Sequence, residues 1–226
     1  MVSGTRFLLL VGSPRKRGTS CSFARTFGTL AAAAGCTAAV EHVYDYYDGR
    51  RPLAALQERI AESDIIGIIA PLYYDSLPGA VVWLLEQLAG DTAAVAALRG
   101  KGLFAIGQCA YPFAALNEPL IATCRCFAGA MAMRWQGGLG YGGGVMIDGA
   151  PLEALGAKGE KIRSALQLAL ADLLLGQEIS DKSQALLTMR FPVAVKWLLA
   201  GLMNLKIWWT ARRMGVPHLS RKVYLQ

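Results

Sequence analysis

The sequence predicts an α/β domain built on a five-stranded parallel sheet, with helices on both faces of the sheet and a helical extension at the C-terminal end. Short apolar runs alternate with helical patterns five times along the chain, which is typical of a parallel sheet. Strands in such a sheet are buried on both faces and are therefore apolar throughout, as these runs are. With 226 residues, 54% of them hydrophobic, the chain suffices for one domain with a large core.

The first expected strand is Arg6–Val11, and Thr19 or Ser20 is expected to cap the helix over residues 19–34, which Gly35 ends. The later strands are expected at residues 37–44, 64–70, 101–107 and 131–136. The later helices are expected at residues 52–63, 80–88, 117–130 and 152–175. The segment GGLGYGGG, residues 137–144, is expected to be an irregular loop, either a flap or a dimer contact, because glycine disfavours regular structure.

The expected order of the strands across the sheet is 2-1-3-4-5, with right-handed connections. In that order, the loops after the first and third strands flank the point where the chain reverses its direction across the sheet. Ligands of open α/β sheets bind at this point, beyond the carboxyl ends of the strands. These two loops are therefore the first candidates for a binding site.

The first of these loops, VGSPRKRGTS at residues 11–20, has the composition of a phosphate-binding loop. Its glycines fit neither the P-loop spacing nor the dinucleotide-binding spacing. A helix that begins after Gly18 presents free backbone N–H groups to a phosphate monoester, and Ser13, Arg15, Thr19 and Ser20 add side-chain donors. The alternative is structural: a hydroxyl caps the helix, and the cations are solvated.

The second loop, PLYYDSLPG at residues 71–79, is aromatic. Tyr73 and Tyr74 offer flat surfaces, and backbone groups from Leu72 to Leu77 offer hydrogen bonds to the edge of a heterocycle. Opposite a phosphate-binding loop, this combination favours a mononucleotide with a large planar ring over a sugar phosphate. The alternative is that both tyrosines are ordinary residues at the rim of the domain.

Together, GSPRKRGTS after the first strand and PLYYDSLPG after the third resemble the NAD(P)H-dependent FMN reductase family of the flavodoxin-like superfamily, and the resemblance covers roughly residues 5–176. It implies a flavodoxin-like three-layer sandwich and FMN as the cofactor. Thr19 stands where the family usually has asparagine, and it keeps a hydrogen-bonding side chain. Carried over by position, the residues expected to bind FMN are Ser13, Arg15, Gly18, Thr19 and Ser20 at the phosphate, Pro71, Leu72, Tyr73, Tyr74, Ser76 and Leu77 around the ribityl chain and the ring, and Gly107, Gln108 and Cys109 beside the polar edge of the ring.

The resemblance implies an oxidoreductase that passes two electrons from NAD(P)H through FMN to a small acceptor, such as a quinone, a flavin, an azo compound or a nitro compound. The flavin carries this chemistry, so no catalytic side chain and no metal site are expected. His42 and His218 are expected to be structural, Asp45 is expected in a loop, and Cys109 is either a buried bystander or redox-active. Members of the family are commonly dimers or tetramers, so a homodimer or homotetramer is expected.

Two other functions stay open. One is a flavodoxin-like electron carrier or a non-catalytic flavin-binding module, although carriers are typically acidic and this chain has a net charge of +7. The other is a quinone reductase at a membrane surface. The sequence has no interleaved basic and aromatic patch, so nucleic acid binding is not predicted. The five cysteines form no Cys-x-x-Cys or zinc-binding pattern, which predicts reduced thiols in a cytoplasmic protein.

The expected division of the chain is an FMN-binding domain at residues 1–179 and a C-terminal extension at residues 180–226. The extension contains FPVAVKWLLAGLMNLKIWWTARR, an apolar stretch that Lys196, Asn204 and Lys206 interrupt. A membrane-spanning helix needs about 20 apolar residues with few charges, so a span is not favoured. Three tryptophans and flanking cations also fit a weak contact with a membrane surface. The favoured interpretation is a helical extension packed on its own domain or on a second subunit.

Overall fold

The computed structural model describes residues 4–189 and 192–215. The chain divides into two compact units, Met1–Met189 and Arg190–Gln226. Helix α8 (Asp181–Leu187) packs against α7 (Gly156–Leu174) and against the last strand of the sheet. Residues 181–187 therefore lie in the first unit, although the sequence analysis placed them in the C-terminal extension.

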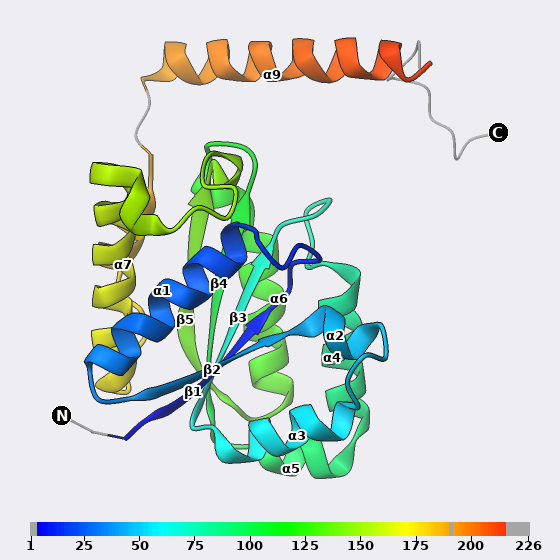
Figure 1. The fold of residues 1–226 in the computed structure, drawn as a ribbon, viewed down its shortest axis with the longest axis vertical. Helices are drawn as coiled ribbons and strands as arrows, with labels where there is room; N and C mark the ends of the chain where they lie inside the picture. The colour runs from blue at the N-terminus through cyan, green and yellow to red at the C-terminus, as the bar shows by residue number, and fades with distance from the viewer. Residues whose placement is uncertain (1–3, 190–191, 216–226) are drawn as a thin grey trace. The chain divides into compact units, whose positions relative to one another are not determined.

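The first unit is built on a five-stranded sheet in which every neighbouring pair of strands is parallel. The strands are β1 (Arg6–Val11), β2 (Thr37–His42), β3 (Ile65–Pro71), β4 (Gly102–Cys109) and β5 (Arg134–Gly142). Their order is β2-β1-β3-β4-β5 (Figure 1). In register, Leu9 of the inner strand β1 stands between Val40 of β2 and Gly67 of β3. This order confirms the predicted flavodoxin-like fold.

Helices cover both faces of this sheet (Figure 1). One face carries α1 (Thr19–Ala33), α7 and α8, and the other carries α3 (Leu53–Glu62), α4 (Gly79–Gly90), α5 (Thr92–Leu98) and α6 (Glu118–Ala130). Because side chains alternate along a strand, Phe7 enters the first core and its neighbour Leu8 the second. In the first core, the ring of Phe27 packs on Phe7 and Phe104, with centroid separations of 5.3 and 5.1 Å. Each such buried ring stabilises the fold by roughly 1.5–3 kcal/mol.

Most boundaries lie within two residues of those expected, but two short helices were not foreseen. Helix α2 (Val43–Tyr47) begins directly after β2, where the sequence analysis continued the strand. Helix α5 is capped by Asp91, whose Oδ1 accepts the backbone N–H groups of Ala93 and Ala94 at 2.8 and 3.0 Å. Helices of one or two turns are too short to show a hydrophobic period. Three 3₁₀ turns complete the unit: η1 (Ala114–Asn117), η2 (Gly144–Met146) and η3 (Leu152–Leu155), the last of which precedes α7.

The glycine-rich segment at residues 137–144 is not an irregular loop, because β5 runs through it to Gly142. Its glycines allow the chain before and within α6 to lie directly on the strand. A Cβ atom at Gly138 would lie 2.6 Å from Cγ2 of Ile121, and one at Gly140 would lie 2.5 Å from the carbonyl oxygen of Ala114. Glycine in a strand marks such a close approach of another segment. The prediction of a loop had instead interpreted these glycines as a sign of irregular structure.

The second unit contains helix α9 (Val193–Arg213), so the expected helical extension is present. Its packing on the domain or on a second subunit stays a prediction, and His218 lies outside the described residues. Within residues 4–189 and 192–215, no single helix is both long and apolar enough to cross a bilayer; only α4 and α5 together reach that length and composition, across a bend of 98°.

We expect Gly140→Ala to destabilise the first unit by about 1–3 kcal/mol, because the new methyl group would overlap the backbone of η1. Gly129→Ala is the control, since nothing lies within 4 Å of an added Cβ there. Gly129 is the last residue but one of α6, where alanine is at least as favourable as glycine. Urea unfolding of both variants measures the difference. A Gly140→Ala protein as stable as the wild type would show that η1 does not lie on β5 in this way.

Candidate functional site

The loops after β1 and β3 meet at the carboxyl edge of the sheet. Gly12 extends β1 by one residue, and its N–H donates to the carbonyl oxygen of Ile69 at 2.9 Å. A Cβ atom at Gly12 would lie 2.4 Å from Cγ2 of Val81 in α4 and 2.9 Å from Cβ of Ala70. Ser13 follows, buried, and its Oγ accepts a backbone N–H at 3.2 Å. The first loop therefore rests directly on the end of β3 and the first turn of α4, in a space that only glycine fits.

The first turn of α1 suits a phosphate group. Gly18, in an extended conformation, is its N-cap, and no side chain caps the helix, so the expectation of a cap from Thr19 or Ser20 is wrong. The first N–H groups of a helix have no partner within it and carry a partial positive charge, and no acidic residue lies in this turn. Ser20 is fully buried, and its Oγ has no hydrogen-bond partner among the described residues. A phosphate oxygen at this turn would satisfy both kinds of donor.

Other side chains of this loop bind the segment after β5, residues 143–150, which the sequence analysis did not place at the site. The Thr19 hydroxyl donates to the carbonyl oxygen of Gly144 at 2.7 Å, and the Arg15 guanidinium donates to Asp148 at 3.0 Å. Asp148 and Gly149 are both left-handed, with φ of 41° and 84°. The Asp-Gly pair is the sequence signal of this tight turn. In this structure, Arg15 is thus paired with a carboxylate, and both side chains are about two-thirds exposed.

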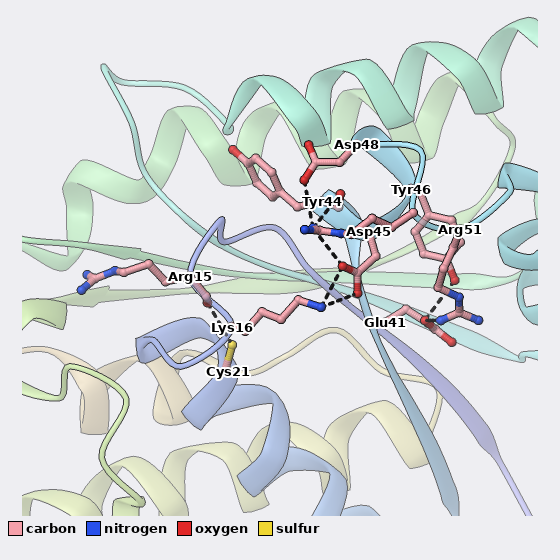
Figure 2. Close-up of polar contacts among 10 residues, drawn as sticks. Arg15, Lys16, Cys21, Glu41, Tyr44, Asp45, Tyr46, Asp48 and Arg51 are labelled. Atoms are coloured by element: carbon pink, nitrogen blue, oxygen red, sulfur yellow. Dashed lines mark hydrogen bonds and ion pairs between the residues drawn. The ribbon is translucent and has the colours of Figure 1, made fainter.

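Lys16 of the same loop contacts α2 on the other side (Figure 2). Its ammonium group lies 2.9 Å from Oδ1 of Asp45, which also binds the guanidinium of Arg50 at 2.9 Å. Asp45 was expected in a loop, but it lies in the first turn of α2. The hydrogen bond from Lys16 holds the pKa of Asp45 below its ordinary value. These ion pairs connect the first loop to α2.

Glu41 fixes α2 against the sheet (Figure 2). This β2 residue is buried, and its carboxylate accepts a hydrogen bond from the Tyr46 hydroxyl at 2.9 Å and binds the guanidinium of Arg51. The Arg51 guanidinium also lies 5.1 Å from the centroid of the Tyr46 ring. A buried carboxylate is tolerated when it is paired in this way. Burial, and after it the bond to Glu41, raises the pKa of Tyr46, and burial lowers the pKa of His42.

The second loop folds into a two-residue hairpin. Tyr73 and Ser76 exchange both backbone hydrogen bonds at 3.0 Å, and Tyr74 and Asp75 between them have φ of 48° and 56°. A left-handed residue other than glycine costs roughly 1–2 kcal/mol, and such strain is concentrated at functional sites. Tyr74 is fully exposed at the tip and Tyr73 is 42% exposed, whereas the Leu77 side chain is buried in the core. The hairpin therefore presents two tyrosines at the surface.

An aromatic row borders this hairpin. Burial, and after it the neighbouring Tyr73, raises the pKa of Tyr44 in α2. The Tyr44 ring packs on Tyr47 at a centroid distance of 6.0 Å, and Tyr47 packs edge-on against Trp83 of α4 at 5.4 Å. Tyr44 and Tyr47 were not predicted at the site because α2 was not predicted, whereas Trp83 lies in a helix that was.

The third predicted stretch, at the end of β4, is mostly interior. The N–H of Leu72, which follows the buried Pro71 at the end of β3, donates to the carbonyl oxygen of Gln108 at 2.8 Å. A Cβ at Gly107 would lie 2.9 Å from Asn117. The Cys109 thiol is buried, 3.3 Å from the carbonyl oxygen of Tyr111, and burial raises its pKa. Of this stretch, only Gln108 is partly exposed, and a Cβ at Gly144 would overlap its side-chain oxygen.

A helix N-terminus suited to phosphate, beside an exposed aromatic hairpin at the carboxyl edge of a 2-1-3-4-5 sheet, defines a flavodoxin-like nucleotide-binding protein. Residues 5–136, more than half of the chain, match the family described as NADPH-dependent FMN reductase, and the chain belongs to this family. FMN is accordingly its cofactor and NAD(P)H its co-substrate. No curated protein matches the chain.

Solved structures share the fold at low sequence identity. The Trp repressor binding protein from Bacillus subtilis has a TM-score of 0.54 at 16% identity, covering 73% of this chain and 97% of that one. A putative quinone reductase from Klebsiella pneumoniae has a TM-score of 0.55 at 13% identity, covering 77% and 86%. General stress protein 14 from Treponema denticola, in complex with FMN, has a TM-score of 0.51 at 15% identity, covering 80% and 99%. At these identities the likeness shows the fold alone.

We expect Asp45→Asn to lower the free energy of unfolding by about 0.5–1 kcal/mol at pH 7, because two exposed cations lose a carboxylate partner. The lowered pKa of Asp45 means that its contribution is present at neutral pH and is lost as the pH falls below its ordinary pKa towards its lower folded-state value. Urea unfolding at pH 7 and near pH 3 tests this. The wild type and the variant should differ at pH 7 and converge in acid, and an equal difference at both pH values would contradict the assignment.

Proposed function

We propose that the protein is an FMN-dependent NAD(P)H oxidoreductase that passes two electrons to a small acceptor. The observation that carries the proposal is the first turn of α1, beside a hairpin that presents Tyr73 and Tyr74. This turn has free N–H groups and the buried Ser20 hydroxyl, which has no partner within residues 4–189 and 192–215. Membership of the NADPH-dependent FMN reductase family supports the same activity. The similar structure named a putative quinone reductase supports a quinone as the acceptor. A flavin, an azo compound and a nitro compound are the other acceptors that we propose.

The residues of the chain have distinct parts in this proposal. The N–H groups of the first turn and the hydroxyls of Ser13 and Ser20 hold the FMN phosphate, and backbone groups of residues 71–77 line the ribityl chain and ring. Bound FMN supplies the redox chemistry, accepting hydride from the nicotinamide and passing two electrons on. Tyr73 and Tyr74 provide the flat surface, and the strained turn at Tyr74 and Asp75 fixes their direction. We also propose that the other positions carried over from the family contribute to FMN binding, because they belong to the loops around this site. These are Arg15, Gly18, Thr19, Gly107, Gln108 and Cys109.

An electron carrier without NAD(P)H activity is the second candidate. Residues 1–189 contain equal numbers of acidic and basic side chains, so the flavin domain lacks the acidic excess typical of carriers. The relevant net charge is that of the flavin domain, which is neutral, and not the +7 of the whole chain. A neutral domain favours the reductase over the carrier. We further propose that the protein is cytoplasmic, in keeping with its five free cysteines. The family resemblance supports the proposal of a homodimer or homotetramer.

The decisive experiment is the anaerobic addition of NADPH or NADH to FMN-loaded protein, followed at the flavin absorption band. We expect rapid loss of the absorption without a second protein, and its return when a quinone or nitroaromatic acceptor is added. A flavin that binds but resists both nicotinamides would assign the protein to the carriers.

The phosphate site is tested by Ser20→Ala, with Ser22→Ala as the matched control. Both serines are buried in α1 and have hydroxyls with no hydrogen-bond partner in the part of the chain that the structure describes, but only Ser20 lies in the first turn. A hydrogen bond to a charged group contributes about 1.5–3 kcal/mol, so Ser20→Ala should weaken FMN binding about tenfold or more. Ser22→Ala should leave the affinity within about twofold of the wild type. Equal affinities of the two variants in a fluorescence titration would place the phosphate elsewhere.

A further inference from the structure

Helix α9 carries an exposed apolar surface, which we call the tryptophan face. It consists of Trp197, Leu198, Leu202, Leu205, Trp208 and Trp209. Leu198, Leu202, Leu205 and Trp209 follow one another at intervals of four, three and four residues, which aligns them on one side of the helix. The six side chains are between 41% and 74% exposed. An exposed patch of this size and composition marks an interaction surface.

The second unit holds the entire net charge of the chain. Seven of the 23 Lys and Arg residues and none of the 16 Asp and Glu residues follow Met189, so the net charge of +7 belongs to residues 190–226. Two of these cations lie over the aromatic rings themselves: the Arg212 guanidinium is 4.2 Å from the centroid of Trp208, and that of Arg213 is 3.7 Å from the centroid of Trp209. Two of the three tryptophans of the face and these two arginines therefore occupy the C-terminal end of α9.

This charge distribution discriminates between the possible partners of the tryptophan face. A second copy of α9 would bring like charges together, and residues 1–189 offer no net negative charge. An anionic lipid surface offers opposite charge and an apolar layer directly beneath it. Tryptophan and arginine favour the headgroup boundary, where the ring is buried while the polar groups stay hydrated. Asn204 and Lys206, within the same helix, fit a position along the surface better than one across the bilayer.

We propose that α9 lies in the headgroup layer of an anionic phospholipid bilayer, with the tryptophan face towards the acyl chains and Arg212 and Arg213 at the level of the lipid phosphates. Each basic residue close to such a surface strengthens binding about fivefold. The proposal concerns the second unit and does not depend on the redox activity of the first.

Vesicle co-sedimentation of the full-length, FMN-loaded protein tests this surface. The vesicles are either pure phosphatidylcholine or equal parts of phosphatidylcholine and phosphatidylglycerol. We expect binding to the anionic vesicles, much weaker binding to the neutral ones, and a loss of binding as the salt concentration rises. Equal binding to both kinds of vesicle, or to neither, would overturn the proposal.

Two pairs of variants locate the contact. Arg212→Gln with Arg213→Gln should weaken binding to anionic vesicles about 25-fold, whereas Arg125→Gln with Arg163→Gln, which removes the same charge from exposed positions of the first unit, should change it less than about twofold. Trp208→Ala with Trp209→Ala should weaken binding about tenfold or more, and more than Met203→Ala with Ile207→Ala elsewhere on α9. Equal losses from the members of either comparison would contradict the assignment.

Sedimentation velocity without lipid tests whether a second copy of the protein, and not a lipid surface, occupies the tryptophan face. If the wild type binds no vesicles and the Trp208→Ala, Trp209→Ala protein is a smaller oligomer than the wild type, the tryptophan face contacts a second copy and the proposal is overturned. Flavin content and NADPH-dependent bleaching should be the same in all variants, because none of these residues belongs to the loops proposed to bind FMN. A failure of the reductase assay with intact lipid binding would leave this proposal standing and remove only the proposed function.

Discussion

The carboxyl edge of the sheet depends on one close approach, that of the Gly12 backbone to Val81 and Ala70. Because no side chain fits at Gly12, the first loop lies flat on β3 and α4 and reaches the first turn of α1 within a few residues. The same contact brings that turn to the side of the sheet where the loop after β3 forms its hairpin. A bulkier residue would lift the loop from the edge, and the helix N-terminus would no longer face the space beside the tyrosines.

Two carboxylates then determine where the cations of the first loop lie. Asp148, from the segment after β5, binds Arg15, and Asp45, from α2, binds Lys16. These bonds draw the two cations to opposite sides and leave the middle of the loop to the N–H groups and the Ser20 hydroxyl. In the proposed site, a phosphate would therefore be held first by neutral donors of fixed direction, and it would compete with Asp148 and Asp45 for the charged ones. Buried Glu41 contributes indirectly, because it holds α2 and hence Asp45 in place.

The fold could be predicted because its signals are local and strong. Continuous apolar runs predicted β1, β3 and β4 to within two residues, and the alternation of strands with helices predicted a parallel sheet. The order of its strands was expected as that of the flavodoxin-like fold. The glycines of β5 were wrongly interpreted as a loop. Glycine is needed there because the strand lies against the backbone of Ala114, which is distant in sequence and close only in the folded chain. Helix α2 was missed since one and a half turns carry no period.

The position of the candidate site could be predicted because its two loops come directly after strands. The sequence placed the two loops on one edge, which the structure bears out, but it gave no account of side-chain direction. The interior position of Leu77 and the bond from Thr19 to the segment after β5 were not predicted, whereas the burial of Cys109 was one of two predicted alternatives. Asp148 and Asp45 belong to elements that lie between the recognisable motifs, and only the folded chain shows that they reach the first loop.

The partition of charge has a practical consequence. The isoelectric point of 9.3 describes the whole chain. Residues 1–189 carry no net charge, and the whole positive excess belongs to the last 37 residues. Retention on a cation-exchange resin would therefore report the state of the C-terminal segment and not that of the flavin domain. Clipping of the chain between the two units would appear as an abrupt loss of retention with the yellow colour unchanged.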